Sequence, residues 1–108
     1  MRRTFRRGVR ARATRDPGFR RALLEEGAAA LLAGDIPGMR TALRTYVNAT
    51  LGFAALARRT GIPDKSLMRM LGPQGNPRAG HLALVLEGLA EEEEISFAVR
   101  AKEPDEED

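Results

Sequence analysis

Apolar residues recur every three or four positions along most of this 108-residue chain, which is the spacing of one face of an α-helix. The clearest case runs from Ile36 through Met39, Leu43 and Tyr46 to Val47. Glycine or proline interrupts the pattern at Gly34, Gly52, Gly61 and residues 72–78. The pattern therefore predicts five helices, which begin near residues 16, 35, 53, 64 and 79.

The first two predicted helices carry recognisable start signals. Asp16 and Asp35 are expected at the N-caps, where a carboxylate accepts a hydrogen bond from an N–H group of the first turn. Pro17 and Pro37 follow them, and proline is tolerated in that turn because its missing N–H is not needed. Gly34 is expected to end the first helix. Its buried face should hold Phe19, Leu23, Ala30 and Leu31, with Ala22 and Gly27 beside them.

Residues 53–71, FAALARRTGIPDKSLMRML, place a glycine four positions after a small residue. Ala57 allows two helices to cross closely, and Gly61 supplies the positive φ that ends the first of them. Pro63 discourages a continuous helix, and Asp64 is expected to cap the second. This compound pattern predicts a helix-turn-helix, whose second helix normally enters the DNA major groove; the alternative is an ordinary helical hairpin. The apolar residues that would hold the two helices together are Leu56, Ile62, Leu67 and Met70.

The run GPQGNPR at residues 72–78 is rich in turn-forming residues and is not expected to form regular structure. A last helix is expected at about 79–90, and the acidic run Glu91–Glu94 is expected to be solvated. Ile95, Phe97 and Val99 then alternate with small or polar residues, which predicts a short strand. Because an isolated strand is marginal in water, its simplest partner is the same segment of a second copy in a homodimer. The apolar face of the last helix should hold Leu82, Val85, Leu86 and Leu89.

Charge is segregated along the chain, although the net charge is only +3. Residues 1–21 carry nine Arg and one Asp, whereas residues 91–108 carry two basic and nine acidic side chains. This asymmetry suggests one anionic and one cationic partner, or two ends that neutralise each other within a dimer. The expected organisation is a flexible basic arm at 1–15, a helical domain at 16–90, an acidic linker with the strand at 91–102 and an acidic tail at 103–108.

Composition narrows the function classes. A chain of 108 residues forms one modest core but is too small for a deep catalytic cleft. The absence of cysteine excludes disulfides and thiolate metal sites, which favours an intracellular, cytoplasmic protein. His81 is the only histidine, Ser66 and Ser96 are the only serines, and no apolar run approaches the ~20 residues of a membrane span. We therefore expect a non-enzyme without metal or cofactor and outside the membrane.

Several motifs together resemble one family. Asp16, Pro17 and Phe19 match an Asp-Pro-x-Phe helix start, residues 52–62 match GxxALAxxTGL, and residues 71–77 match L-S-x-x-G-N-P except at Gly72. With the final LALVLEGL helix, the chain from about 16 to 99 resembles the small lambda-repressor-like antitoxins known as addiction-module antidote proteins. These are the partners of RelE/ParE-like toxins. The resemblance implies an all-α fold, autorepression and toxin neutralisation.

The resemblance fails at the positions that would face DNA. The family's second helix typically begins Ser-Arg-Glu-Ser-Leu-Tyr-Lys, whereas this chain has PDKSLMR at residues 63–69. The usual Arg is Asp64, the usual acidic residue is Lys65 and the usual Tyr is Met68. The framework positions therefore resemble those of the family, but the family's operator sequence cannot be transferred to this chain.

Candidate functional residues follow from this geometry. Near the start of the second helix, the expected base-reading side chains are Asp64, Lys65, Ser66, Met68 and Arg69. Arg and Lys pair with guanine O6 and N7. The alternative for Lys65 and Arg69 is that they only form a solvated helix face. Arg58, Arg59 and Arg78 are expected to contact phosphates. The arm is expected to lie in the minor groove or on phosphates. Equally, it could bind any polyanion or only keep the chain soluble. The arginines concerned are Arg2, Arg3, Arg6, Arg7, Arg10 and Arg12.

The sequence thus predicts an all-α, lambda-repressor-like five-helix domain with a helix-turn-helix and a short C-terminal strand. Its expected function is to bind an operator in double-stranded DNA as a dimer and to repress its own operon. The resemblance adds a co-encoded RelE/ParE-like toxin as partner, with the acidic end at Glu91–Glu94 and Asp105–Asp108 as the better contact because such toxins are basic. Two alternatives stay open: a toxin-binding module without specific DNA binding, and a non-specific binder of RNA or nucleoid DNA.

Overall fold

The computed structural model describes residues 12–13 and 15–104, and this part of the chain folds into helices without a strand. The all-α prediction is therefore confirmed, and each predicted helix is present within a few residues of its expected position. The helices are α2 (Pro17–Leu32), α3 (Ile36–Ala49), α4 (Gly52–Thr60), α5 (Asp64–Met70) and α6 (Ala79–Glu93).

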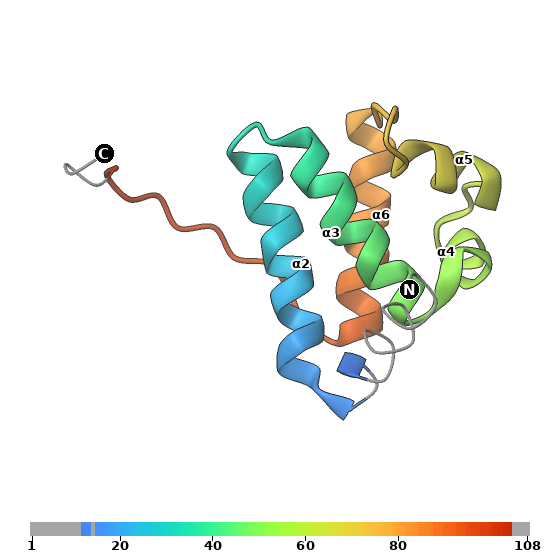
Figure 1. The fold of residues 1–108 in the computed structure, drawn as a ribbon, viewed down its shortest axis with the longest axis horizontal. Helices are drawn as coiled ribbons and strands as arrows, with labels where there is room; N and C mark the ends of the chain where they lie inside the picture. Colours follow the sequence, from blue (N-terminus) through green and yellow to red (C-terminus); the bar gives the residue numbers. More distant parts are fainter. Residues whose placement is uncertain (1–11, 14, 105–108) are drawn as a thin grey trace, which may run out of the picture.

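The helices are arranged around α6, which links the two sides of the molecule (Figure 1). On one side α2 packs along α3, and α6 lies against α2. On the other side α4 packs against both α3 and α6, and α5 packs against α4. The shorter helices α4 and α5 thus form one flank of the domain, at the right of Figure 1.

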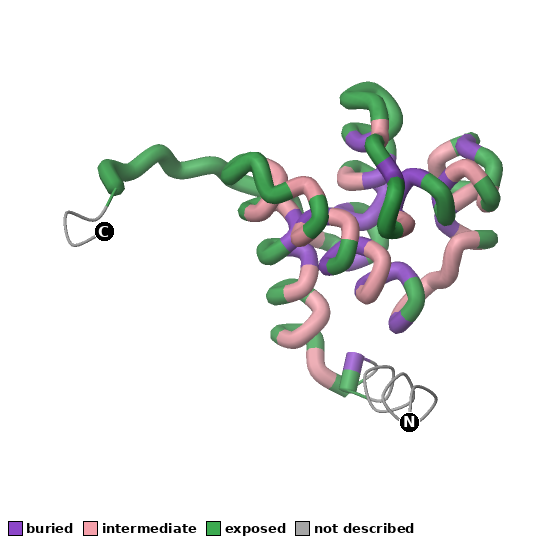
Figure 2. Tube along the Cα trace, turned by 45° about the horizontal axis from the view of Figure 1, so that its top comes forward, coloured by how far each residue is buried: buried purple, intermediate pink, exposed green. Residues whose placement is uncertain are grey.

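Buried residues lie where these helices face one another (Figure 2). The residues predicted to hold α4 and α5 together are all buried, since Leu56 and Leu67 are fully enclosed and Ile62 and Met70 nearly so. The predicted face of α2 was only approximate, because its fully buried side chain is Leu24. The four residues that the pattern favoured in α2 are only half-buried: Phe19, Leu23, Ala30 and Leu31.

Gly27 is the other buried residue of α2, and it lies against α3. A Cβ atom at this position would lie 2.6 Å from Cδ2 of Leu43 on α3 and 3.6 Å from Cβ of Ala42. The two helices therefore approach each other closely at Gly27, where a larger side chain would meet a fully buried leucine.

The helix ends follow the sequence signals with one exception. Oδ1 of Asp16 accepts from the N–H of Phe19 at 3.1 Å, and Oδ1 of Asp35 accepts from Gly38 at 2.9 Å, so both predicted caps are confirmed. Asp64, however, is the first residue of α5 and not its cap. Pro63 takes the N-cap position because its extended backbone, with ψ at 143°, already precedes the helix. The Asp64 carboxylate instead accepts from the N–H of Lys65 at 2.8 Å.

The C-terminal segment differs from its prediction. Helix α6 continues to Glu93, beyond the expected end at residue 90, and Glu94 ends it with φ at 57°. The strand predicted at Ile95, Phe97 and Val99 is not present, since residues 95–104 have no regular secondary structure and lead away from the helices (Figure 1). A strand needs a neighbour to bond its backbone N–H and C=O groups, and the described part of the chain offers none.

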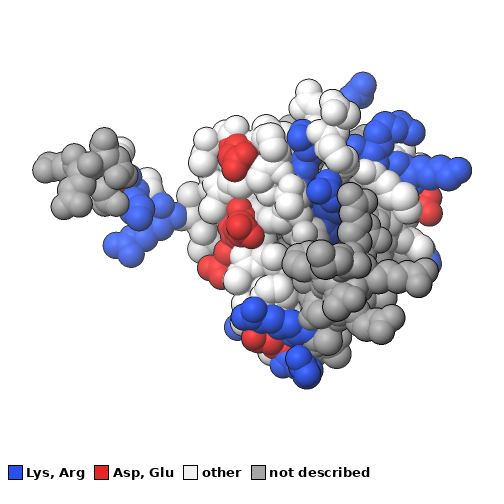
Figure 3. Space-filling model, viewed as in Figure 1, with Lys and Arg blue, Asp and Glu red and all other residues white. Residues whose placement is uncertain are grey.

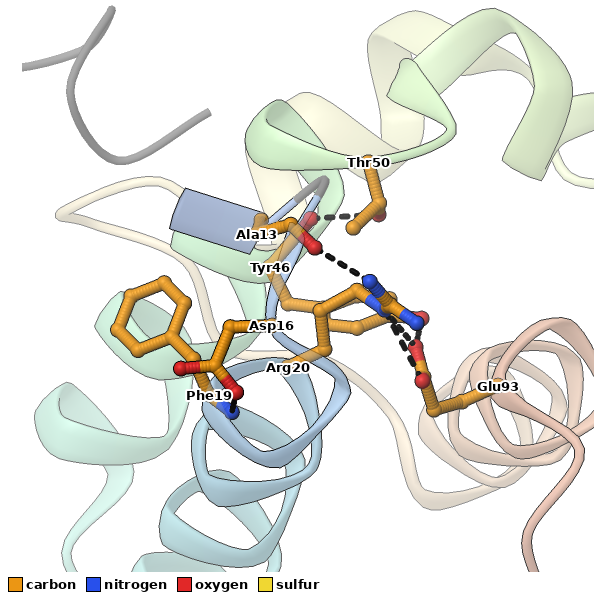
Figure 4. A network of polar contacts seen from close by, with 7 residues as sticks. All are labelled: Ala13, Asp16, Phe19, Arg20, Tyr46, Thr50 and Glu93. Atoms are coloured by element: carbon orange, nitrogen blue, oxygen red, sulfur yellow. Dashed lines mark hydrogen bonds and ion pairs between the residues drawn. The ribbon is translucent and has the colours of Figure 1, made fainter. Parts of the chain in front are cut away.

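Glu93 also contradicts the expectation that the run Glu91–Glu94 is solvated. Its side chain is only 5% exposed, and Nε of Arg20 donates to its two carboxylate oxygens at 2.9 and 3.0 Å (Figure 4). The phenol of Tyr46 donates to Oε1 of Glu93 at 2.8 Å, and the Arg20 guanidinium also donates to the carbonyl of Ala13. One carboxylate thus joins α2, α3 and α6.

This network shifts the protonation of both partners of Glu93. Burial, reinforced by the hydrogen bond to Glu93, raises the pKa of Tyr46 above its ordinary value of 10.0. The hydrogen bond to Glu93 likewise raises the pKa of Arg20. The neighbouring Glu92 pairs with Arg59 of α4 at 2.9 Å, but both side chains are more than one third exposed, so this pair adds little stability.

The raised pKa of Tyr46 predicts a specific alkaline instability. The neutral phenol is favoured by folding, so its contribution is complete below pH 10.0 and is lost as the pH rises above that value. Tyr46→Phe should lower the free energy of unfolding by about 1–2 kcal/mol at neutral pH, and this difference from the native chain should shrink above pH 10.0.

Urea unfolding of both chains at neutral and alkaline pH measures this difference. The chain has one tyrosine and no tryptophan, so phenolate absorbance reports on Tyr46 alone. Ionisation at the ordinary tyrosine pKa with helical circular dichroism intact would contradict a buried, hydrogen-bonded phenol.

Candidate nucleic-acid interface

Helices α4 and α5 are joined by a tight turn at residues 61–63. Gly61 adopts φ at 79°, the left-handed conformation predicted for it, and its N–H donates to the carbonyl of Ala57 at 2.8 Å. The hydroxyl of Thr60 donates to the carbonyl of Leu56 at 2.9 Å and accepts from the N–H of Ile62 at 3.2 Å. Because Ile62 is also buried, the turn is fixed by both hydrogen bonds and packing.

Helix α5 has two distinct faces. Leu67 and Met70 are buried against the rest of the domain. Lys65, Met68 and Arg69 are exposed, with Met68 48% accessible, and their spacing of three and one places them on one outward face. Two other predicted base-reading residues, Asp64 and Ser66, are half-buried at the start of the helix. The structure therefore brings three of the five together at the surface.

Several cations near this face have no partner among the residues that the structure describes. Among the described residues, no ion pair or side-chain hydrogen bond is formed by Arg58, Lys65, Arg69 or Arg78, and all four are exposed. Figure 3 shows Lys and Arg side chains on the α5 side and also at the start of α2, with Asp and Glu side chains mainly along α2. Arg59 differs, since it is paired with Glu92. The free cations are suited to an anionic partner.

The predicted arm lies largely outside the described residues, which is true of Arg2, Arg3, Arg6, Arg7 and Arg10. Residues 105–108 of the predicted acidic tail at 103–108 lie outside them as well. Arg12 is described. Its Nε lies 3.7 Å from Oδ2 of Asp16, and its guanidinium sits 4.5 Å above the ring of Phe19. Arg12, the last of the six arginines predicted to contact DNA, is thus attached to the start of α2.

Sequence reasoning missed two arginines on α3. Arg44 donates to the carbonyl of Leu71, and Arg40 donates to the carbonyls of Pro73 and Gly75 in the connection between α5 and α6. Neither stands out in the sequence, because both lie at the edge of the apolar stripe of α3, where a solvated cation is the ordinary expectation. Only the folded chain shows that they point toward the end of α5.

A concave feature lies at the C-terminal end of α3, away from Arg40. This hollow, of about 590 Å³, is bounded by the start of α2, the end of α3 and the end of α6, and Tyr46 and Thr50 line it. Five charged residues line it. Arg20 is bonded to Glu93 and Glu92 to Arg59, and the other two are Arg21 and Glu94. Within the described ranges, no group of three or more His, Cys, Asp or Glu side chains is placed to hold a metal ion. None of the described helices is long and apolar enough to cross a membrane.

The surface on and around α5 is therefore the described part of the molecule whose exposed cations are best suited to an anionic partner. Comparisons with protein-family models, with curated proteins and with solved structures give no match to this chain.

Proposed function

We propose that this protein is a sequence-specific regulator that binds double-stranded DNA by placing α5 in the major groove, as the second helix of a helix-turn-helix in a lambda-repressor-like domain. The observation that supports this most is the outward face of α5, where Lys65, Met68 and Arg69 project from a helix whose other face is buried. Arg and Lys can donate to guanine O6 and N7, and the Met68 side chain suits the methyl group of thymine. Asp64 and Ser66 lie at the start of the same helix, where polar contacts with bases are made.

Phosphate contacts would hold this helix in register. Arg58, at the end of α4, and Arg78, just before α6, are exposed and have no partner among the described residues. Arg59 is a weaker candidate because it would have to share or leave Glu92. Such contacts carry no sequence information, but they fix the orientation in which α5 meets the bases.

The proposed regulator acts as a homodimer on a palindromic operator. A helix of seven residues reaches only a few base pairs, so two copies are needed to specify a site. Two-fold symmetry would place the copies of α5 about one helical turn, ~10 bp, apart. An operator upstream of its own gene would make the protein an autorepressor.

Neutralisation of a co-encoded RelE/ParE-like toxin is the second proposed function. It is supported by the sequence resemblance and by the C-terminal segment, where Phe97 and Val99 are 36% and 77% exposed on a stretch without regular structure. Exposed apolar side chains on an extended segment are suited to capture by a partner. The negative charge of residues 91–108 would favour a basic partner.

The two alternative functions predict different binding behaviour. A toxin-binding module without specific DNA binding would leave the α5 face unused. A non-specific binder would use the Arg-rich arm on any RNA or DNA, so its affinity would depend on charge and not on sequence.

The first prediction for this function concerns base reading. Arg69→Ala and Lys65→Ala should each weaken binding to the upstream operator by ~1–3 kcal/mol and relax preference at one base pair. Arg21→Ala is the matched control, because Arg21 is an exposed arginine on α2, away from α5, and should leave the affinity unchanged. Gel-shift titrations on the operator and on a scrambled duplex at physiological salt measure both effects. Equal affinity of the native chain for the two duplexes would refute specific repression.

The second prediction concerns the arm. Deleting residues 1–11 removes five arginines but keeps Arg12 with its partners Asp16 and Phe19. Because each neutralised phosphate contributes ~0.9 to the slope of log affinity against log salt, the deletion should flatten that slope while the ranking of sites is retained. The same slope for the shortened and native chains would show that the arm does not touch DNA.

The third prediction separates toxin binding from DNA binding. Removal of residues 97–108 leaves Ile95 in place, whose side chain packs on the core and whose N–H donates to the carbonyl of Ala90 at 2.9 Å. The shortened chain should therefore fold and bind the operator, yet fail to restore growth when co-expressed with the product of the adjacent gene. Growth restored equally by both chains would exclude this segment as the toxin contact, and an adjacent gene product without toxicity would leave only the regulatory function.

A further inference from the structure

Two guanidinium groups from α3 bind the backbone that follows α5. Nη1 of Arg44 donates to the carbonyl of Leu71 at 2.5 Å. Nη2 of Arg40 donates to the carbonyl of Pro73 at 2.9 Å, and its Nη1 donates to the carbonyl of Gly75. Three carbonyls of one five-residue connection are therefore held by two side chains of one neighbouring helix.

This arrangement is not explained by ordinary charge pairing. Arg40 and Arg44 lie four residues apart on α3, where like charges repel each other. No carboxylate among the described residues forms an ion pair with either of them. The Nε of Arg40 is moreover buried without a hydrogen-bond partner, which is unfavourable. The contacts to the carbonyls are thus the interactions that compensate for bringing these two cations together.

The connection in turn folds tightly onto the last turn of α5. Gly75 is buried, and a Cβ atom placed there would lie 2.1 Å from the carbonyl oxygen of Met70 and 2.4 Å from that of Arg69. Only glycine permits this approach. Because Gly75 lies against the end of α5, holding its carbonyl also holds the end of that helix.

Helix α5 needs such support. It has seven residues, of which only Leu67 and Met70 are buried, and no side chain caps its first turn. Helices this short are not stable by themselves. The guanidinium groups also lie near the carbonyl end of α5, where positive charge is favourable.

We infer that Arg40 and Arg44 are positioning residues, which fix the direction of α5 by clamping the 71–75 connection to α3. This inference rests on the proposed function for its consequence: the clamp would hold Lys65, Met68 and Arg69 in the orientation that the major groove requires. An unclamped α5 would sample other orientations, and the apparent affinity for the operator would fall in proportion to the competent fraction.

The first test uses the full-length protein without DNA. Hydrogen exchange of the amides from Leu67 to Gly75 should accelerate in Arg40→Gln and Arg44→Gln, while exchange in α2 and α6 stays unchanged. Arg21→Gln is the matched control, since Arg21 is exposed and far from the connection. Unchanged exchange of the 67–75 amides in both variants would overturn the clamp. Acceleration throughout the chain would overturn it as well, because it would indicate a general loss of stability.

Lysine replacements make the test sharper. Arg44 uses one nitrogen for one carbonyl, so the single ammonium group of Arg44→Lys can replace it. Arg40 uses two nitrogens for two carbonyls, so Arg40→Lys cannot span them. Slow exchange should therefore return in Arg44→Lys and not in Arg40→Lys. Equal exchange rates in the two lysine variants would indicate that only the positive charge matters and not the number of donor nitrogens.

The second test measures DNA binding by the same variants at several salt concentrations. A positioning role predicts roughly tenfold weaker binding to the operator by Arg40→Gln, with unchanged binding to a scrambled duplex and an unchanged salt slope. Weaker binding to both duplexes with a shallower slope would show that Arg40 contacts phosphate, which would overturn the positioning role. Faster exchange at α5 combined with a native chain that does not distinguish the duplexes would leave the clamp standing and refute the proposed function.

Discussion

The arrangement of the domain depends on the hydrogen bonds and the ion pair made by the buried carboxylate of Glu93. It lies at the end of α6 and binds Arg20 of α2 and Tyr46 of α3. A buried charge is tolerated only when it is paired and hydrogen-bonded, and here two charge-assisted bonds from Arg20 and one bond from the phenol meet that requirement. Loss of Arg20 would leave an uncompensated buried charge, which is far more damaging than the loss of an exposed pair such as Arg59–Glu92.

The sequence was sufficient to predict those features that depend on neighbouring residues. Asp16 and Asp35 cap their helices as expected because a cap involves residues three positions apart. Gly61 adopts its left-handed conformation for an equally local reason, since the turn needs a residue without a Cβ atom. The face of α3 was also predicted correctly, because its apolar residues repeat with a clear helical period.

Features that depend on distant residues could not be predicted in this way. Glu93 is one of four consecutive glutamates, and nothing in that run distinguishes it until α6 brings it against Tyr46, 47 positions away in the sequence. Arg40 and Arg44 reach carbonyls about thirty residues further along the chain, and carbonyls carry no sequence signal. The alternation of Ile95, Phe97 and Val99 was a real pattern, but Ile95 packs on the core without a ladder of backbone hydrogen bonds.

Arg40 and Arg44 bind backbone carbonyls and not side chains, which affects the substitutions that this protein can accept. Every residue supplies a carbonyl, so the attachment of α5 does not depend on which side chains its outward face carries. Position 75, which only glycine can occupy, lies outside that face. Substitutions at positions 65, 68 and 69 can therefore alter the chemistry of the exposed surface while the support beneath it is retained. The domain is thus a suitable framework for laboratory selection of new surface chemistry, with variation confined to these three positions.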